Sequence, residues 1–360
     1  MTRYLRNAWY AAAFADEVAE VPLARTLLDV DMVLFRRSDG TVALLEDRCA
    51  HRFAPLSQGR VKGDEIECGY HGLRFDGSGA CTHNPHSGGE PARPGVRVRA
   101  WPALERDGFI WFWPGDPDRR DEALLPRFPF LSDPDRFSTI KGRLHVRGHY
   151  QLVVDNLLDL SHAAYLHPEF AASGVSAERA LAATTTRLER RGRTVYNYRL
   201  RSGLPSPGPS RRLFGFGDEP MNSKSHMTWH PPAVLDFDLG QWEVGTPEED
   251  GLALPQAHVI TPETEFTSHY FFANARNRRL NDPEVDQALL KVFDTAFRTQ
   301  DEPMIEAVQR RMGRVSDIRE LKPVLLATDA APLAARRLLA RLIADEDQAD
   351  GRPAAGPDPG

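Results

Sequence analysis

Two short segments of this 360-residue sequence each bring one cysteine and one histidine together. They are Cys49-Ala50-His51 and Cys68-Gly69-Tyr70-His71, and sixteen residues separate His51 from Cys68. Two such turns would supply two thiolates and two imidazoles to one site. This donor set suits either tetrahedral zinc or a [2Fe–2S] cluster in which two histidines replace two cysteines on one iron.

The order of the ligands favours the cluster. Zinc fingers commonly place their two cysteines together and their two histidines together, whereas each pair here is mixed. The spacing therefore predicts a Rieske-type [2Fe–2S] site, with Cys49 and Cys68 on one iron and His51 and His71 on the other. A zinc site, or two core cysteines that happen to neighbour histidines, are the alternatives.

Three further residues near these turns need no metal. Cys81 is expected to be a small core or loop residue. His83 and His86, in the segment 83–86, are expected to hold the loop rather than to bind metal. Gly69 and Gly72 would let the second turn close tightly.

A second group of polar residues lies in the segment 155–167, which contains Asp155, Asp159, His162 and His167. The first three share one side of a helix by the i+3 and i+4 rule. His167 lies about 140° further round, so both histidines can face one ion only where the helix ends or bulges. Pro168 disfavours helical geometry at the preceding residue, which predicts a helix end there. A purely structural role for the histidines remains the alternative.

Two imidazoles and one carboxylate on one face of Fe(II) leave positions open for dioxygen and substrate. Asp301, between two amphipathic segments, could supply the carboxylate. Spacing alone instead favours Asp301 as a helix N-cap. Taken together, the two sites would form one redox enzyme, in which the cluster relays electrons to an iron that binds oxygen.

The elements that must position these residues differ along the chain. Up to about residue 115 the pattern predicts β-structure, with hairpins around 38–40 and 107–108. The long irregular stretch 48–95 between them is typical of a functional segment. We expect a β-domain at 1–120 and a proline-rich linker at 121–135.

The remainder predicts an α+β domain at 136–345. A helix over 150–167 is followed by alternating, strand-like segments within 195–273. Asp282-Pro283 predicts a helix N-terminus, and 331–344 predicts a last amphipathic helix. The tail 346–360, dominated by Gly, Pro and Asp, is expected to be disordered.

Composition restricts the partners and the compartment. Forty-five basic against 51 acidic residues give a formal charge of −6, which argues against nucleic acid or an anionic membrane as partner. No stretch approaches the length of a membrane span. Three cysteines cannot form a disulfide framework, and the apolar run after Arg6 is too short for a secretion signal, so we expect a cytoplasmic protein.

On these motifs the chain resembles the oxygenase components of the Rieske non-haem iron oxygenases, in the branch of the vanillate and dicamba demethylases. The resemblance covers nearly the whole chain. It implies an α+β protein with an N-terminal all-β Rieske domain and a C-terminal catalytic domain of helix-grip type, with an antiparallel sheet and helices. The segments that carry it are 7–10, 49–57, 68–73, 83–86, 155–162 and 258–272.

The resemblance also implies residue roles. His162, His167 and Asp301 would bind iron, which replaces the N-cap interpretation of Asp301. Asn156 would line the iron pocket. Asp159 would bridge His71 of one subunit to His162 of its neighbour in a head-to-tail homotrimer. His258 would contact substrate, with a pocket-wall role as the alternative.

The implied reaction is O2-dependent O-demethylation of a methoxylated, vanillate-like aromatic acid, which gives a phenol and formaldehyde. No G-x-G-x-x-G follows a strand, so NAD(P)H would act through a separate reductase or ferredoxin. The alternatives are hydroxylation or N-/C-methyl oxidation of another aromatic, a pure electron carrier, or a zinc-dependent interaction module. The substrate-facing residues within 205–245 cannot be aligned, and Pro303 leaves the helix start beside Asp301 unsettled.

Overall fold

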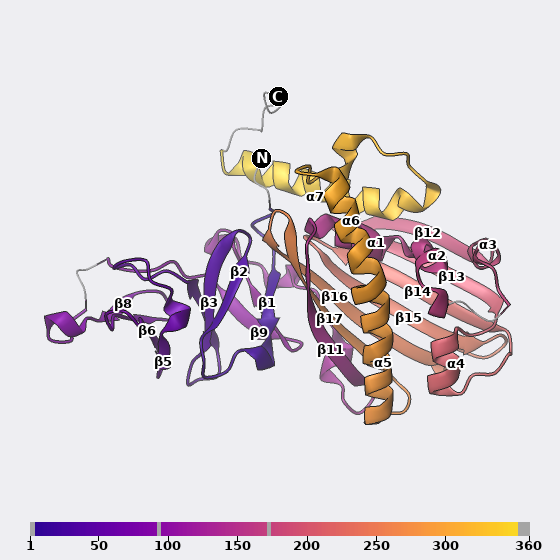
Figure 1. Ribbon diagram of the computed structural model, residues 1–360, viewed down its shortest axis with the longest axis horizontal. Coiled ribbons are helices and arrows are strands. Elements are labelled where there is room, and N and C mark those ends of the chain that lie inside the picture. The colour runs from indigo at the N-terminus through magenta and orange to yellow at the C-terminus, as the bar shows by residue number, and fades with distance from the viewer. Residues whose placement is uncertain (1–3, 92–94, 171–173, 352–360) are drawn as a thin grey trace. The chain divides into compact units, whose positions relative to one another are not determined.

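The computed structural model describes residues 4–91, 95–170 and 174–351. It divides into two compact units. The first comprises residues 1–127 with two returning segments, 261–264 and 345–360. The second comprises residues 128–260 and 265–344. Each unit is described by itself below (Figure 1).

The first unit is built from three small antiparallel sheets, β1-β10-β9, β2-β3-β4 and β5-β6-β7-β8. Both predicted hairpins are present: β3 pairs with β4, and β9 pairs with β10 across the Asp107-Gly108 turn. The strands are β1 (Tyr10–Phe14), β2 (Leu23–Leu27), β3 (Val30–Arg36), β4 (Val42–Glu46), β5 (Arg60–Lys62), β6 (Glu65–Glu67), β7 (Arg74–Asp76), β8 (Cys81–His83), β9 (Ala103–Arg106) and β10 (Phe109–Phe112).

The predicted linker and the predicted tail both contain ordered structure. The expected linker at 121–135 carries short 3-10 turns and buries Leu125, Phe128 and Phe130, so much of it packs as ordered structure. The expected disordered tail begins inside helix α7 (Ala330–Ala349). Glu346 is buried and accepts hydrogen bonds from two N-terminal backbone amides, which keeps this part of the helix ordered. Residues 352–360 lie outside the described part of the chain.

The second unit is an α+β domain around one antiparallel sheet of order β11-β17-β16-β15-β14-β13-β12. Residues 261–264 of β16 are grouped with the first unit. The strands are β11 (Ser138–Val146), β12 (Thr184–Arg191), β13 (Thr194–Leu204), β14 (Met221–His230), β15 (Val234–Glu243), β16 (Leu252–Thr264) and β17 (Thr267–Arg276).

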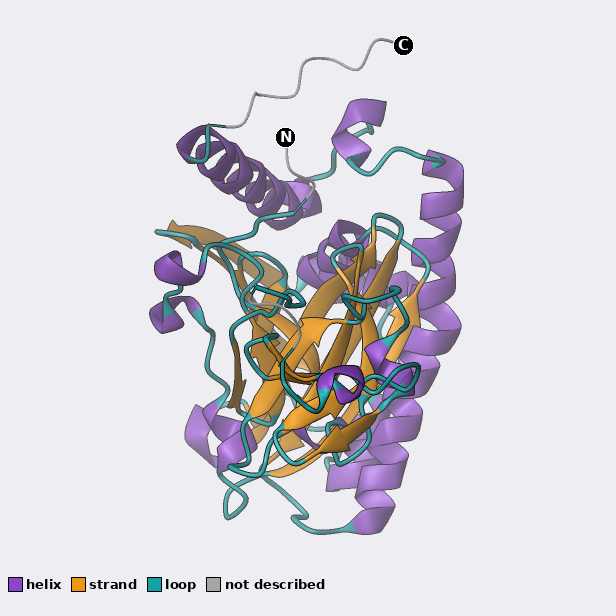
Figure 2. Cartoon of the chain, turned by 90° about the vertical axis from the view of Figure 1, so that its left-hand side faces the viewer, coloured by secondary structure: helices purple, strands orange, loops and turns teal. Residues whose placement is uncertain are grey.

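Helices cover one face of this sheet. Helices α5 (Pro283–Ala296) and α6 (Glu302–Met312) are joined without a loop and form one long rod beside the strands (Figure 2). As predicted, Asp282 caps α5, because its carboxylate accepts from the amides of Glu284 and Val285. The other helices of this face are α1 (Tyr150–Leu158), α2 (Ala163–Leu166), α3 (Ala177–Ala182) and α4 (Gly208–Phe214).

The helix predicted over 150–167 is broken. Helix α1 ends at Leu158, Asp159 leaves helical geometry with φ −107° and ψ 88°, and α2 begins at Ala163. The Asp159 side chain accepts from the amide of Ser161, so it starts a new short turn rather than continuing the helix. Asp155, Asp159 and His162 therefore do not share one continuous helix face.

Candidate functional site

The two predicted cluster-binding turns have the same backbone design. In the first, the Cys49 amide donates to the carbonyl of Ala54, and the Phe53 amide donates back to the Cys49 carbonyl, at 2.9 and 3.0 Å. In the second, the Cys68 amide donates to Leu73, and the Gly72 amide donates back to Cys68, at 2.8 and 3.0 Å. Each turn thus presents a cysteine, and a histidine two or three residues later, on a closed loop.

Both turns need a left-handed residue four positions after the cysteine. Gly72 fills that position with φ 74°, as the sequence suggested. Phe53 fills it with φ 61° in the first turn, which is unusual for a residue with a side chain. The Phe53 ring is exposed and lies under the guanidinium of Arg48, 3.9 Å from the ring centroid.

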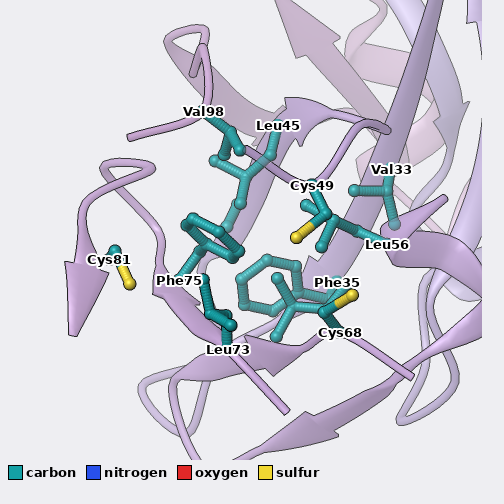
Figure 3. Packing of buried hydrophobic residues seen from close by; sticks show 12 residues of the cluster. Val33, Phe35, Leu45, Cys49, Leu56, Cys68, Leu73, Phe75, Cys81 and Val98 are labelled. Atoms are coloured by element: carbon teal, nitrogen blue, oxygen red, sulfur yellow. The ribbon is translucent and has the colours of Figure 1, made fainter. Parts of the chain in front are cut away.

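The four side chains are arranged with sulfur inside and imidazole outside. Cys49 and Cys68 are almost fully buried in the core of the first unit, as Figure 3 shows, whereas His51 is exposed and His71 is half-exposed. The imidazole rings of His51 and His71 meet edge to face, with their centroids 4.5 Å apart. Burial raises the pKa of the Cys49 thiol to about 11. A thiolate there needs a bound cation, so the donor set fits a cluster whose histidine-bound iron lies nearer the surface.

Cys81 is buried in the core, as expected, and the neighbouring histidines lie on the loop and strand that follow the second turn. Cys81 is buried in the same hydrophobic core, on the side of Phe75 away from the other two sulfurs (Figure 3). The His86 ring nitrogen Nε2 lies 3.1 Å from the backbone carbonyl of His71, so His86 holds the loop that carries a predicted ligand. His83 lies in strand β8, opposite Arg74.

In the second unit, His162, His167 and Asp301 converge. His162 Nε2 lies 3.3 Å from Asp301 Oδ1, and His167 Nε2 lies 3.3 Å from Asp301 Oδ2. Among the described residues, this is the group whose donor atoms come within 4.8 Å of one another. His167 and Asp301 are buried and His162 is half-buried.

Neighbouring groups fix the protonation of both imidazoles. The Nδ1 atom of His162 lies 2.5 Å from the backbone carbonyl of Asp159, and that of His167 lies 2.5 Å from Gln300 Oε1. These oxygens accept hydrogen bonds, so Nδ1 carries the proton and Nε2 of a neutral ring keeps its lone pair. Two lone pairs and a carboxylate thus point at one another. A divalent metal ion fits this arrangement.

Asp301 is held ionised within the group. Burial acts to raise its pKa, but the surrounding side chains of His162, His167 and Asn156 outweigh burial and lower the pKa to about 2. Asn156 Nδ2 donates to Asp301 Oδ1 at 2.9 Å. Asn156 also lines the adjoining cavity, as predicted, and orients the carboxylate.

A π-helical turn, Phe297–Asp301, sets the direction of the Asp301 side chain. Pro303 has no N–H and its ring clashes with the carbonyl four residues earlier, so a regular α-helix cannot run through this point. The wider turn absorbs the interruption between α5 and α6. The Asp301 side chain caps no backbone amide here, so the N-cap alternative was wrong. Such turns are frequent at functional sites.

Asp159 and Asp155 separate in the structure. Asp159 lies between the end of α1 and His162, and its backbone carbonyl orients that imidazole. Asp155 instead forms an ion pair with Arg336 of α7, at 2.6 Å. The structure therefore gives Asp155 a packing role.

A mainly apolar cavity of about 380 Å³ adjoins His162, His167 and Asp301. The predicted substrate contact His258 lines it from β16 and is buried. Its Nδ1 atom lies 2.7 Å from the Tyr270 hydroxyl, while Nε2 has no hydrogen-bond partner among the described residues. Burial lowers the pKa of His258 to about 3, so the ring is neutral.

Sequence reasoning missed several residues that organise this site. Gln300 and Tyr270 act through His167 and His258, and neither forms part of a spacing pattern. Arg199 and Arg201 alternate along β13 and line the cavity. Their i, i+2 spacing with Asn197 was the available signal, because it marks one face of a strand.

Comparisons with known proteins agree with this geometry. Residues 8–102 match the Rieske [2Fe-2S] domain, and residues 146–345 match the vanillate O-demethylase oxygenase C-terminal domain. The chain is 39% identical to the oxygenase component of dicamba O-demethylase from Stenotrophomonas maltophilia, over 94% of this chain and 98% of that one.

Other relatives include an enzyme named for a different reaction and a second O-demethylase. The oxygenase component of chloroacetanilide N-alkylformylase from Rhizorhabdus wittichii is 38% identical over 97% of both chains. The vanillate O-demethylase oxygenase subunit of a Pseudomonas species is 33% identical over 96% of both. The crystal structure of dicamba monooxygenase bound to 3,6-dichlorosalicylic acid superposes with a TM-score of 0.88 at 35% identity, over 95% of this chain and 98% of that one.

Both halves of the chain are matched, and the relatives align over nearly its full length. The expected fold class, an all-β Rieske domain followed by an α+β domain with an antiparallel sheet, is confirmed. The chain belongs to the vanillate O-demethylase type of Rieske non-haem iron monooxygenase, as the oxygenase component that carries a [2Fe–2S] cluster and a mononuclear iron.

Proposed function

We propose that this oxygenase O-demethylates a methoxylated aromatic acid. The observation that carries the proposal is the convergence of two imidazole lone pairs and the Asp301 carboxylate beside an apolar cavity with few polar groups. One oxygen atom of O2 would enter a C–H bond of the methoxy group and the other would leave as water, with two electrons and two protons consumed. The resulting hemiacetal collapses to the phenol and formaldehyde.

Each proposed site residue has a task in this reaction. His162, His167 and Asp301 would hold the iron, and Cys49, Cys68, His51 and His71 the cluster. When bound, these groups supply one-electron transfer and oxygen activation. Asn156 keeps Asp301 oriented. The free Nε2 of His258 would form a hydrogen bond with a substrate oxygen, and the apolar walls would hold the ring and exclude water.

The electrons would come from NAD(P)H through a separate reductase or ferredoxin. The two compact units are accounted for by the Rieske and oxygenase domains, and the relatives are named as components of systems. Among the described residues, no helix is long and apolar enough to cross a bilayer. We propose a cytoplasmic location, because the three cysteines are unpaired and two of them would have to reach the cluster as thiols.

The experiment is a single turnover without reductase. The chemically reduced protein is mixed with O2 and a panel of methoxybenzoates and other methylated aromatics. We expect formaldehyde in proportion to active sites, together with the matching phenol. A hydroxylated product without formaldehyde would overturn O-demethylation in favour of ring hydroxylation.

We also propose a head-to-tail homotrimer in which Asp159 links His71 of one subunit to His162 of the next. The support within one chain is that Asp159 already orients His162 through its carbonyl. We expect Asp159→Asn to leave both metal centres occupied and nearly abolish turnover. Normal turnover in this variant, or a monomer by sedimentation with full activity, would contradict the proposal.

N-dealkylation is the second candidate, because one relative is an N-alkylformylase. The iron ligands would be the same, so only the cavity distinguishes the two reactions. A panel that pairs each methoxybenzoate with the corresponding N-methylanilide separates them by product.

A further inference from the structure

Two arginine side chains line the iron cavity from strand β13. Arg199 and Arg201 are two residues apart, so they lie on the same face of the sheet, the face that forms the cavity floor. Arg199 is only 8% exposed, and Arg201 is partly buried. A cavity with mainly apolar walls therefore carries two neighbouring cations.

Neither cation has a counter-ion in the described part of the chain. No ion pair involves Arg199 or Arg201, and Nε of Arg199 is buried without a hydrogen-bond partner. Asp159 affects Arg199 only through the longer-range attraction of its negative charge, because the Asp159 carboxylate accepts a hydrogen bond from the Ser161 amide. Among the described residues lining the cavity, the one carboxylate is Asp301, which His162, His167 and Asn156 already hold.

Lys224, a third basic side chain that lines the cavity, has the counter-ions that the two arginines lack. Lys224 Nζ lies 2.7 Å from Asp238 and 2.6 Å from Glu248. The arginines have no equivalent, and burial lowers the pKa of both, with the charge of Arg199 lowering that of Arg201 further. Two mutually repelling, unpaired cations, one buried and one partly buried, cost stability unless something else neutralises them.

The strand register sets the positions of the pair along β13 relative to the turn that precedes His162. Asn197 donates to the carbonyl of Leu158 at the end of α1, beside the iron-site turn. Arg199 and Arg201 follow at about 7 and 13 Å further along β13, at roughly 3.3 Å per residue. Arg201 pairs with Ser223 of β14, which also lines the cavity.

We propose that Arg199 and Arg201 bind the anionic group of the aromatic substrate, a carboxylate or a sulfonate, and so select anionic rings over neutral ones. The planar guanidinium groups match such oxyanions by paired hydrogen bonds. The anion supplies the missing counter-ion, while the ring extends through the apolar part of the cavity towards His258 and the iron. This inference rests on the proposed function in taking the cavity's ligand to be the substrate.

The test is ligand binding to the full-length holoenzyme under anaerobic conditions, measured by calorimetry. Benzoate is compared with benzamide, which has nearly the same shape and no charge. We expect benzoate to bind at least tenfold more tightly. Arg199→Gln and Arg201→Gln should each weaken benzoate about 10- to 100-fold and leave benzamide within about twofold. Arg187→Gln, on exposed strand β12, is the matched control and should change neither.

A stability measurement separates ligand binding from a structural role. Removing an unpaired buried charge should not destabilise the protein, so ligand-free Arg199→Met should keep or raise the Tm. A fixed concentration of benzoate that saturates the wild type should raise the Tm of the wild type more than that of this variant. A lowered ligand-free Tm, with benzoate still stabilising, would overturn the proposal.

Other outcomes of the binding experiments also support or overturn the proposal. Binding of benzenesulfonate as tight as that of benzoate supports a general oxyanion site, and its rejection supports a carboxylate site. Equal binding of benzoate and benzamide overturns the proposal. So does an Arg199 variant that binds benzoate normally but slows cluster-to-iron electron transfer, because Arg199 would then serve Asp159. Anion-selective binding without formaldehyde from any methoxy compound would overturn the proposed reaction and leave this inference standing.

Discussion

The two proposed metal-binding regions are built in opposite ways. The cluster region takes its four donors from residues 49–71, on two turns that share one hydrogen-bond pattern. The iron region takes two donors, His162 and His167, from a broken helix and the third, Asp301, from a π-turn far later in the sequence. The first is specified locally, whereas the second exists only once the sheet and helices have packed.

They also differ in how they meet solvent. The cluster region exposes its imidazoles and buries its sulfurs, which suits an electron entering or leaving through the histidines. The iron region buries its carboxylate and opens to a cavity, which suits a reaction that must exclude water. The following changes test whether the two regions are as independent as this comparison suggests.

The largest effect should come from removing one donor in each region. We expect Cys68→Ser to abolish the cluster and retain about one iron per chain, and Asp301→Ala to lose that iron and retain the cluster. Turnover should fall by at least about a thousandfold in both variants, because each retains only one of the two metal centres through which electrons must pass. Iron analysis with electron paramagnetic resonance reads the two sites separately. Loss of both centres in either variant would show that the regions are coupled.

Shortening the π-turn should disable the iron region without removing any donor. Deleting Thr299 would convert Phe297–Asp301 towards α-helix and rotate Asp301 by about 100°. We expect iron affinity to fall at least about 100-fold while the cluster spectrum stays unchanged. A Thr299→Ala substitution, which keeps the chain length, is the control and should retain iron.

A smaller effect is expected at Gln300, which contacts a proposed iron ligand rather than the iron itself. Gln300→Leu removes the acceptor that holds the proton on Nδ1 of His167. Iron affinity or activity should drop about 10- to 100-fold, as for other residues that orient a metal-bound histidine. Gln300→Glu keeps an acceptor and should recover most of the loss, which a simple packing role would not explain.

The cluster region could be predicted from the sequence because its information is local. Donor types and spacing pointed to both turns, and Gly72 pointed to the tight geometry of the second. Asp301 was different: spacing alone favoured an N-cap, and only resemblance pointed to the metal. The reason is the π-turn, since one extra residue per turn changes the direction of a side chain without leaving a periodicity to read.

Other misses share that cause. The break at Asp159 depends on its side chain competing for the Ser161 amide, and the order of 346–349 depends on the distant amides of Arg6 and Asn7. Arg199 and Arg201 look like ordinary charges on one face of a strand until the helices close over that face. In each case the decisive partner is supplied by tertiary structure.

Acid should affect the two regions differently. Glu67 of β6 is buried, and burial acts to raise its pKa, but Arg60, Arg74 and Lys62 lower it to about 2. Its stabilisation is therefore present above pH 4.5 and lost as pH falls towards 2. We expect Glu67→Gln to lower the unfolding free energy of the wild-type protein by roughly 1–3 kcal/mol at pH 7, and the difference to vanish near pH 2.

The comparison can be sharpened by following each region during the same titration. Cluster absorbance reports the first unit and iron release the second. Glu67 and the cations around it belong to the first unit, and those cations do not titrate at low pH. The difference between Glu67→Gln and the wild type should therefore appear in cluster loss. The same difference in iron release with none in cluster loss would count against a local role for Glu67.

The smallest effects are expected at the left-handed positions of the two turns. Gly72→Ala should destabilise the first unit by about 1–2 kcal/mol, from the backbone conformation and a new contact with Pro85. Phe53→Gly should relieve a similar strain but lose the contact with Arg48, leaving a net change below about 1 kcal/mol. Chemical denaturation monitored at the cluster measures both changes. If Phe53→Gly destabilised the first unit as much as Gly72→Ala does, Phe53 would carry no backbone strain and the two turns would not be equivalent.

The rod formed by α5 and α6 has a consequence for how such an enzyme can acquire new substrates. The same helix places Phe293 and Phe297 against the cavity and, one turn later, Asp301 against the proposed metal. Remodelling that wall for a larger ring therefore risks detuning the metal. The opposite wall, on strands β13 to β16, holds no proposed iron ligand. Variation in specificity is more freely explored there, and a library for directed evolution belongs on the sheet.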